Sequence, residues 1–199
     1  MEAELFAFIE RYMPLTEEEK AMLRGMPLFR HFRKGEVFLR EGEVADQQFF
    51  VLKGCVRCFY WVEGEERTTD FFTELESVVP RQAGSAGTAG YNLACVEDSI
   101  LLVGTADMEQ ELFASFPRFE KLCRLLTEQL LSQSHTALDT FKTTTAEQRY
   151  RHLLASRPGL VQRVPLQQLA SYLGVRPESL SRIRRRIAKE GSTATTKPV

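Results

Sequence analysis

The stretch from Val164 to Ile187, VPLQQLASYLGVRPESLSRIRRRI, constrains the fold more than any other part of the sequence. Its first half, Leu166 to Leu173, carries apolar residues at helical spacing. Gly174 follows where a chain that leaves a helix often needs a positive φ, which glycine adopts without a Cβ penalty. Pro177 suits the first turn of a second helix, because its missing N–H would have no partner there. The stretch therefore predicts a helix-turn-helix.

The second helix of this pair is expected to have two different faces. Leu180, Ile183 and Ile187 form its apolar stripe. The remaining positions are polar and mostly cationic, a composition that suits the major groove of DNA. They are Glu178, Ser179, Ser181, Arg182, Arg184, Arg185 and Arg186. Two short amphipathic helices with a glycine between them also occur in proteins that never touch nucleic acid, so the apolar pattern alone leaves both interpretations open.

The distribution of charge favours nucleic acid. Residues 142–199 carry 12 Lys and Arg against 3 Asp and Glu, a net charge of +9. Residues 1–141 carry 14 against 24, a net charge of −10, so the total of −1 hides the asymmetry. A basic face on a small domain attracts phosphates, whereas an acidic domain is repelled from the duplex. The sequence thus predicts that the C-terminal part binds DNA.

Composition places the chain among soluble globular proteins. At 199 residues and 43% hydrophobic content it is long enough for two compact domains. It has no apolar run near the ~20 residues of a membrane span, and its acidic, amphipathic N-terminus does not resemble a signal peptide. We therefore expect a cytoplasmic protein that does not insert into membranes.

The residues that could hold a metal are few and scattered. A single C-x-x-C pair lies in an expected strand, where residues three apart point to opposite faces, and the histidines have no ligand spacing. No set of nucleophile and base is apparent either. We therefore predict no metal, no cofactor, no disulfide framework and no enzymatic activity. The residues considered are Cys55, Cys58, Cys95, Cys123, His31, His135 and His152.

The first half of the chain changes its periodicity near Phe32. Residues 2–13 and 16–24 predict two short helices, with Thr16 as the N-cap of the second. Glycines then punctuate β-rich runs about every ten residues, which predicts antiparallel strands in a small roll, and residues 91–103 add a further strand region. We expect an α+β fold whose N-terminal antiparallel β-roll is a double-stranded β-helix of the cupin-like kind, flanked by helices.

Helices are expected after the roll, one over 107–116 and a long one over 117–141. The apolar stripe of the long helix could pack on an identical helix of a second chain, or it could cover the roll of its own chain. This stripe comprises Phe119, Leu122, Cys123, Leu126, Leu130, Ala137 and Phe141. A capping box over Thr144–Glu147 opens the next helix, which should end before Pro158, and a polar tail follows Glu190. The expected domains are 1–116, 117–141 and 142–199.

In this order of parts the chain resembles the Crp/Fnr family of bacterial transcription regulators. The resemblance rests on KGEVFLREGEVADQQFFVLKGCVRCFYW at 34–61, EQRY at 147–150 and the stretch 164–187. It implies a cyclic nucleotide-binding-like roll, a long dimerisation helix and a C-terminal helix-turn-helix domain, in many members winged. It also implies a homodimer, a palindromic double-stranded operator, an unknown small-molecule effector and RNA polymerase as a further partner.

The family's base-reading E-x-x-S-R pattern matches Glu178, Ser181 and Arg182. Arg can donate two hydrogen bonds to guanine, and Glu can accept one from cytosine. Glu178 and Arg182 lie four residues apart and could instead form an ion pair within the helix. At least one of the arginines at 184–186 should contact phosphate rather than bases. The expected DNA-binding residues are Arg176, Glu178, Ser179, Ser181, Arg182, Arg185 and Arg186.

The sequence departs from the family's cyclic-nucleotide cassette. Nucleotide-binding members carry Gly-Glu followed about ten residues later by Arg-Ser or Arg-Thr, whereas this chain has no Gly-Glu pair there. Without that Arg a buried phosphate would stay uncompensated, so we expect an effector other than cyclic AMP. Arg81 is a weak candidate to replace it. The alternative function is a ligand-binding or protein-interaction module of the same fold without specific DNA binding.

Overall fold

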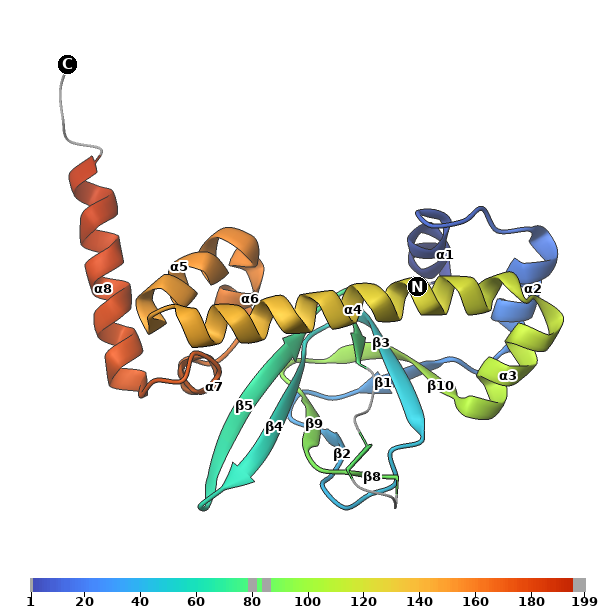
Figure 1. The fold of residues 1–199 in the computed structure, drawn as a ribbon, viewed down its shortest axis with the longest axis horizontal. Coiled ribbons are helices and arrows are strands. Elements are labelled where there is room, and N and C mark those ends of the chain that lie inside the picture. The colour runs from blue at the N-terminus through green and yellow to red at the C-terminus, as the bar shows by residue number, and fades with distance from the viewer. Residues whose placement is uncertain (1, 79–81, 84–86, 195–199) are drawn as a thin grey trace.

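The computed structural model describes residues 2–78, 82–83 and 87–194. Helices lie at both ends of the chain, with antiparallel strands between them (Figure 1). The helices are α1 Glu2–Glu10, α2 Glu17–Gly25, α3 Ala106–Ser115, α4 Arg118–Thr143, α5 Ala146–Ser156, α6 Pro158–Arg163, α7 Leu166–Tyr172 and α8 Pro177–Ala194. The strands are β1 Phe29–Phe32, β2 Val37–Leu39, β3 Gln47–Lys53, β4 Val56–Val62, β5 Glu65–Phe72, β6 Ser77–Val78, β7 Gln82–Ala83, β8 Thr88–Ala89, β9 Asn92–Cys95 and β10 Ser99–Thr105.

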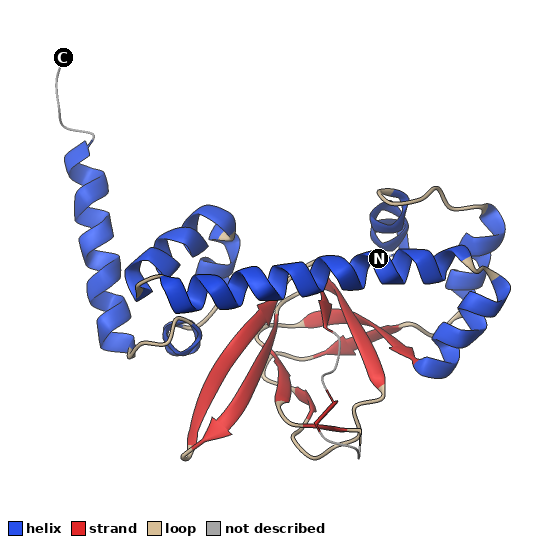
Figure 2. Cartoon of the chain, viewed as in Figure 1, coloured by secondary structure: helices blue, strands red, loops and turns tan. Residues whose placement is uncertain are grey.

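The strands form a roll of two four-stranded sheets, as the glycine spacing predicts (Figure 2). One sheet has the order β1-β10-β3-β6 and the other the order β2-β9-β4-β5, while β7 and β8 form a separate pair. The turn between β4 and β5 contains Glu63 and Gly64, both with positive φ (52° and 79°). Two consecutive positive φ values match the twist of a tight hairpin, which explains the glycine there.

The sheet that contains β3 and β10 is buried on both faces. Phe49 and Val51 of β3 face the interior of the roll, whereas the alternate residues Phe50 and Leu52 pack with α1, α2 and α4. This alternation follows from the two-residue period of a strand. The helices at the N-terminal end thus cover the outer face of this sheet.

The helix α4 runs across the roll from α3 to α5 (Figure 1). Phe119 and Leu122, in the first half of the stripe expected to form a dimer interface, are buried against α1 and β3. That half therefore covers the roll of its own chain, which is the second of the two interpretations. The exposed large apolar residues of α4 are Leu125, Leu131, Leu138 and Phe141, of which only Phe141 belongs to the predicted stripe.

One local expectation after α4 is wrong by a single residue. The capping box opens at Thr145 with Gln148, not at Thr144 with Glu147, because Thr144 bonds back to the Thr140 carbonyl and ends α4. The helix that follows ends at Ser156, before Pro158 as expected, and Pro158 begins α6, where proline fits the first turn.

Three boundaries expected from the sequence also differ in the structure. The helix α1 ends at Glu10 rather than at residue 13, and the region 91–103 is divided into β9 and β10. The last helix continues through Ala194, past the tail start expected after Glu190. No strand follows β10 in the described part of the chain, so the expected wing is absent as far as residue 194. Residues 191–194 contain no proline, and they extend α8 instead.

The C-terminal helices share a hydrophobic core with the roll. Cys55, Phe71 and Val96 of the roll are buried together with residues of α5 to α8, among them Tyr150 and Leu169. The Phe71 and Tyr172 rings lie 5.3 Å apart at 65°, an edge-to-face contact. The C-terminal region is therefore packed directly on the β5 side of the roll.

Candidate nucleic-acid interface

The turn between α7 and α8 has the geometry that the sequence predicts. Gly174 has φ +71°, and the N–H groups of Gly174 and Val175 bond back to the carbonyls of Ser171 and Ala170 at 2.9 and 3.0 Å. This pair of bonds is the Schellman arrangement, which requires the left-handed conformation at the glycine. Leu169 of α7 and Leu180 of α8 are fully buried, so apolar packing fixes the angle at which the two helices cross.

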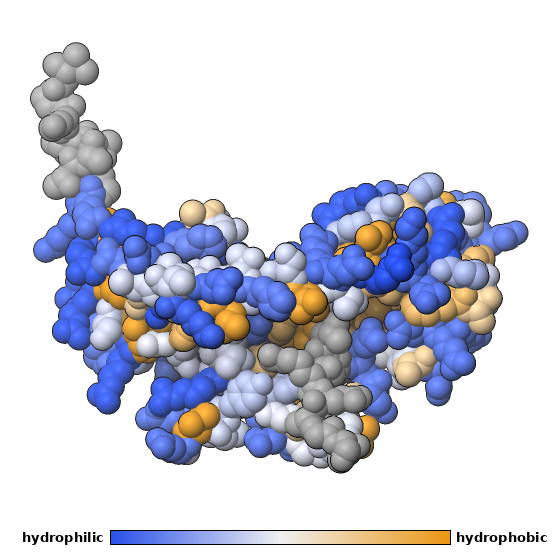
Figure 3. All heavy atoms as spheres, viewed as in Figure 1, coloured by the Kyte–Doolittle hydropathy of each residue, from blue (hydrophilic) through white to orange (hydrophobic). Residues whose placement is uncertain are grey.

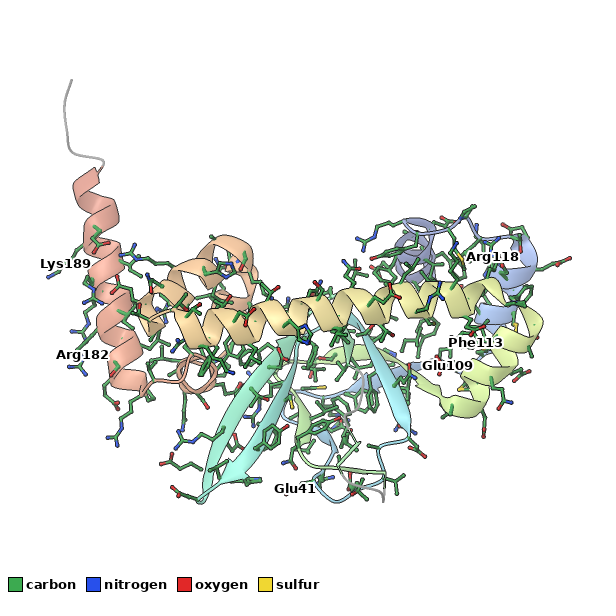
Figure 4. The ribbon with its side chains drawn as sticks, viewed as in Figure 1. Glu41, Glu109, Phe113, Arg118, Arg182 and Lys189 are labelled. Carbon is green, nitrogen blue, oxygen red and sulfur yellow. The ribbon has the colours of Figure 1, made fainter. Side chains whose placement is uncertain are left out.

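The second helix of this pair, α8, presents its cations to solvent. Leu180 and Ile183 point into the core, whereas the side chains on the other faces are exposed. In Figure 4, Arg182 and Lys189 point away from the body of the molecule at the far end of the chain. The exposed basic residues along this helix and at its start are Arg176, Arg182, Arg184, Arg185, Arg186 and Lys189, which we call the α8 basic face.

The polar residues predicted beside them are arranged around Arg182. Its Nη2 donates to the Ser179 hydroxyl at 3.3 Å, so Ser179 rather than Glu178 is the partner that the structure gives Arg182. Glu178 is exposed in the first turn of α8, whereas Ser179 and Ser181 are half-buried. In place of the Glu178–Arg182 ion pair considered from the sequence, the structure has a hydrogen bond from Arg182 to Ser179, three residues earlier in α8.

Arg186 differs from the other predicted contacts because it faces α5. Its guanidinium is paired with Glu147, and Arg151 of α5 is paired with both Glu147 and Glu190. This small network crosses from α5 to α8 and fixes the two helices against each other. Arg186 therefore has a role in packing that the spacing of residues within α8 does not reveal.

Arg149 joins the end of α4 to the turn before α8. Its guanidinium donates to the Leu173 carbonyl from Nε and Nη2, at 3.3 and 2.9 Å. Its Nη1 donates to the carbonyls of Phe141 and Thr144 at 3.1 and 2.6 Å, and the group lies 4.5 Å from the Phe141 ring centroid. A Cβ on Gly174 would lie 3.2 Å from the same ring. Arg149 belongs to the EQRY motif, but the sequence pattern does not indicate these contacts.

Two further arginines fix the C-terminal helices on the roll. Arg163 of α6 donates to Glu74 at 2.7 and 2.8 Å and is also paired with Glu97. Arg157, which precedes α6, donates to Glu76 at 2.7 Å and to the Phe71 carbonyl at 3.1 Å. The excess positive charge of residues 142–199 is therefore divided. Part of it binds the acidic roll, and part is exposed along α8.

The proposed effector region is only partly described. Arg81 lies outside the described residues. The interior of the roll is packed with apolar side chains, among them Phe38, whose ring lies 4.9 Å from the rings of Phe32 and of Phe49. Tyr91 is also buried in this interior core.

The four cysteines are free thiols, and Cys55, Cys58 and Cys95 are buried. Burial raises the pKa of Cys55 to about 12. Cys55 and Cys58 belong to different cores, so the prediction that they face opposite sides of a strand region is confirmed. In the described residues no cluster of three or more His, Cys, Asp or Glu side chains is placed to hold a metal ion. Nor does any described helix combine the length and apolar character that a membrane crossing needs.

Comparisons with known proteins bear on the roll and on the whole fold. Residues 29–116 match the family model of the cyclic nucleotide-binding domain. No curated protein sequence matches the chain. Three solved structures are similar in fold at low sequence identity.

FixK2 from Bradyrhizobium japonicum has a TM-score of 0.68 and 16% identity, over 82% of this chain and 85% of that chain. CLP, the c-di-GMP responsive global regulator of Xanthomonas campestris, has a TM-score of 0.66 and 18% identity, over 88% and 93%. A protein from Eubacterium rectale, described as a transcriptional regulator of the Crp/Fnr family, has a TM-score of 0.64 and 14% identity, over 89% and 85%. Residues 29–116 thus match the cyclic nucleotide-binding domain, and most of the chain is similar in fold to these three proteins, one of which is described as a regulator of the Crp/Fnr family.

Proposed function

We propose that the chain is a DNA-binding transcription regulator of the Crp/Fnr type, and that α8 is the recognition helix of a helix-turn-helix. The observation that carries the proposal is the α8 basic face, which is exposed on a helix whose other side is fixed by Leu180 and Ile183. A rigid, cationic helix of this kind fits the major groove. In this proposal residues 1–116 sense a signal, 117–141 dimerise and 142–199 bind DNA.

Within this face the residues have different roles. Arg182, held by Ser179, is the base-reading residue, with Glu178 and Ser181 beside it. Arg176 and Arg185 are exposed and suit phosphate contacts. Arg186 supports the helix through Glu147 and could reach phosphate only by leaving that pair.

The regulator is proposed to act as a homodimer. Leu131 and Leu138 are 57% and 51% exposed and lie seven residues apart, so they share one face of α4. Packing the same face of a second copy against them would bury these leucines and place two copies of α8 on two half-sites of a palindromic operator.

The effector is proposed to differ from cyclic AMP. The departure from the nucleotide cassette supports this, and so does the aromatic packing of the roll interior. Calorimetric titration of the full chain with cyclic AMP should give no binding heat.

Selection from a random duplex library tests DNA binding, with the bound fraction sequenced at several salt concentrations. We expect an enriched, two-fold symmetric site. Arg182→Glu should abolish the preference for one guanine in each half-site and leave the fold intact, because the bidentate contact is lost and a negative charge faces the base.

The matched control is Lys53→Glu, the same charge reversal at an exposed position on the roll. It should bind the selected site like the unmodified chain. Unchanged site preference in Arg182→Glu would refute the role given to Arg182. A library without any enriched site would refute the proposed function and favour the alternative module.

A further inference from the structure

Helices cover the outer face of the sheet that contains β3 and β10, but their side chains do not completely fill the space between the helices and the sheet. Between this face and the helices α1, α3 and α4 the structure has a recess of about 270 Å³. Figure 3 shows apolar atoms in the hollow below α4, between the roll and the α3 end of the molecule. It lies on the side of β3 that carries Phe50, opposite to the aromatic interior of the roll.

The walls of the recess are mainly apolar. They are built by residues from seven elements, so the recess is a product of the tertiary fold. The principal ones are Phe8, Phe50, Leu112, Phe113, Leu122 and Leu126. For comparison, an engineered apolar cavity of about 150 Å³ in another protein stays dry and binds benzene. When such a space is empty, the side chains of its walls lack packing partners. Binding of an apolar molecule that fills the space is therefore favoured.

The polar groups of the recess lie at one side, near the start of α3. Glu109 and Phe113 are one turn apart on α3, and both line the recess, where Figure 4 labels them. Glu109 accepts a hydrogen bond from the Gln48 amide at 3.1 Å through Oε2. The hydroxyls of Thr105 and Thr127 each make one hydrogen bond, since Thr105 caps α3 and Thr127 donates to the Cys123 carbonyl. The Glu109 carboxylate is the strongest acceptor on the walls, because a charged acceptor makes a stronger hydrogen bond than a neutral one.

We propose that this recess binds a small amphipathic molecule with an apolar body, either a single ring or a medium-length alkyl chain, and an uncharged or cationic head that donates a hydrogen bond to Glu109. A carboxylate head is disfavoured by repulsion from the Glu109 carboxylate at close range. A bound molecule would contact α3 and α4 at once. It would therefore act on the helix that carries the dimer contact, and calling it the effector rests on the proposed function.

Isothermal titration calorimetry of the full chain with 1-octanol and with octanoate tests the site, because the two probes share a chain length and differ in the head group. We expect 1-octanol to bind and octanoate to bind at least about tenfold more weakly. Glu109→Gln should reduce this difference, since the amide does not repel the carboxylate. Absence of binding by 1-octanol, or equal binding of both probes to the unmodified chain, would overturn the proposal.

A variant that fills the recess locates the site. Leu112→Trp should weaken 1-octanol binding about tenfold or more, whereas Val62→Trp, at an exposed position of the roll, should bind like the unmodified chain. Equal binding by both variants would overturn the location. Circular dichroism of the variants checks their folding.

A measurement on the unmodified chain does not depend on any variant. Cys123 lines the recess and is the one half-buried thiol, and burial raises its pKa to about 11. We expect 1-octanol to slow its alkylation by N-ethylmaleimide, and an unchanged rate would count against the site. Arg182→Glu should bind 1-octanol normally, so failure of this site and failure of DNA binding are distinguishable.

Discussion

At the scale of single residues, Arg149 connects the end of α4 with the end of α7. One guanidinium satisfies carbonyls at the end of α4 and at the end of α7, and it stacks on Phe141, which lies beside Gly174. Carbonyls at helix ends lack partners within the helix, so a fixed cation placed among them is strongly favoured. Arg149 is thus a positioning residue for α8 relative to α4.

We predict that Arg149→Lys lowers the free energy of unfolding by about 1–3 kcal/mol, because an ammonium group cannot reach all three carbonyls or stack in the same way. Urea denaturation followed by circular dichroism measures this. Arg151→Lys, at a more exposed ion pair on the same helix, should cost only about 0–1 kcal/mol. Equal effects of the two substitutions would contradict the role of Arg149.

Gly54 is a second residue whose identity is fixed by its surroundings. It has φ +108°, and a Cβ there would lie 2.2 Å from the Ser99 hydroxyl oxygen. We predict that Gly54→Ala costs about 2–4 kcal/mol, because backbone strain and overpacking add. Gly159→Ala has open space and should change stability by less than about 1 kcal/mol. Thermal unfolding of both variants checks the contrast.

At the scale of elements, α6 is attached to the roll by charge. Arg163 lies between Glu74 and Glu97, and the Glu74 carboxylate also accepts from the Gly54 N–H at 2.9 Å. Burial alone would raise the pKa of Glu74, but the hydrogen bonds from Arg163 and Gly54 outweigh it and lower the pKa below 4.5.

This lowered pKa predicts the pH dependence of the contact. A carboxyl with a depressed folded-state pKa stabilises the fold above its unfolded-state pKa, and this contribution is lost as the pH falls through the folded-state value. Glu74→Gln should therefore be less stable than the unmodified chain near neutral pH, by on the order of 1 kcal/mol because the pair is partly exposed. The difference should shrink and disappear as the pH falls through the folded-state pKa of Glu74. A difference that stays constant as the pH is lowered would refute the ionic origin.

At the scale of the whole molecule, the roll and the C-terminal helices are joined by a shared core as well as by charge. Phe71 and Tyr172 are in contact, and the Thr68 N–H donates to the Ser171 hydroxyl at 2.9 Å. The α8 basic face remains exposed in this arrangement, at the end of the molecule away from α1 and α2 (Figure 1).

The proposed dimer is tested at this scale. Leu131→Asp combined with Leu138→Asp should shift the chain to the monomer in sedimentation equilibrium, because four carboxylates would meet in an apolar interface. It should also weaken binding to a palindromic site. Trp61→Asp combined with Val62→Asp, at exposed apolar positions of the roll, should leave the association unchanged. A dimer that withstands the α4 substitutions would place the interface elsewhere.

The sequence by itself determined the features that depend on near neighbours. The turn at Gly174, the cap at Thr16 and the two faces of α8 follow from preferences within one or two helical turns. The glycines between strands follow from the backbone of single turns, so the roll could be predicted as well. The capping box was misplaced by one residue because Thr144 and Thr145 have equal local preference, and only the end of α4 decides between them.

Only the tertiary structure decided the contacts between distant parts of the chain. Arg163 and Glu97 are 66 residues apart, and Thr68 and Ser171 are 103 apart, so no local pattern indicates these pairs. For the same reason the apolar stripe of α4 does not show by itself which half of the helix packs against the roll of the same chain. The recess beside α3 likewise depends on how seven elements fit together. Local preference selects the elements, whereas packing over long sequence separations decides which of their surfaces remain exposed.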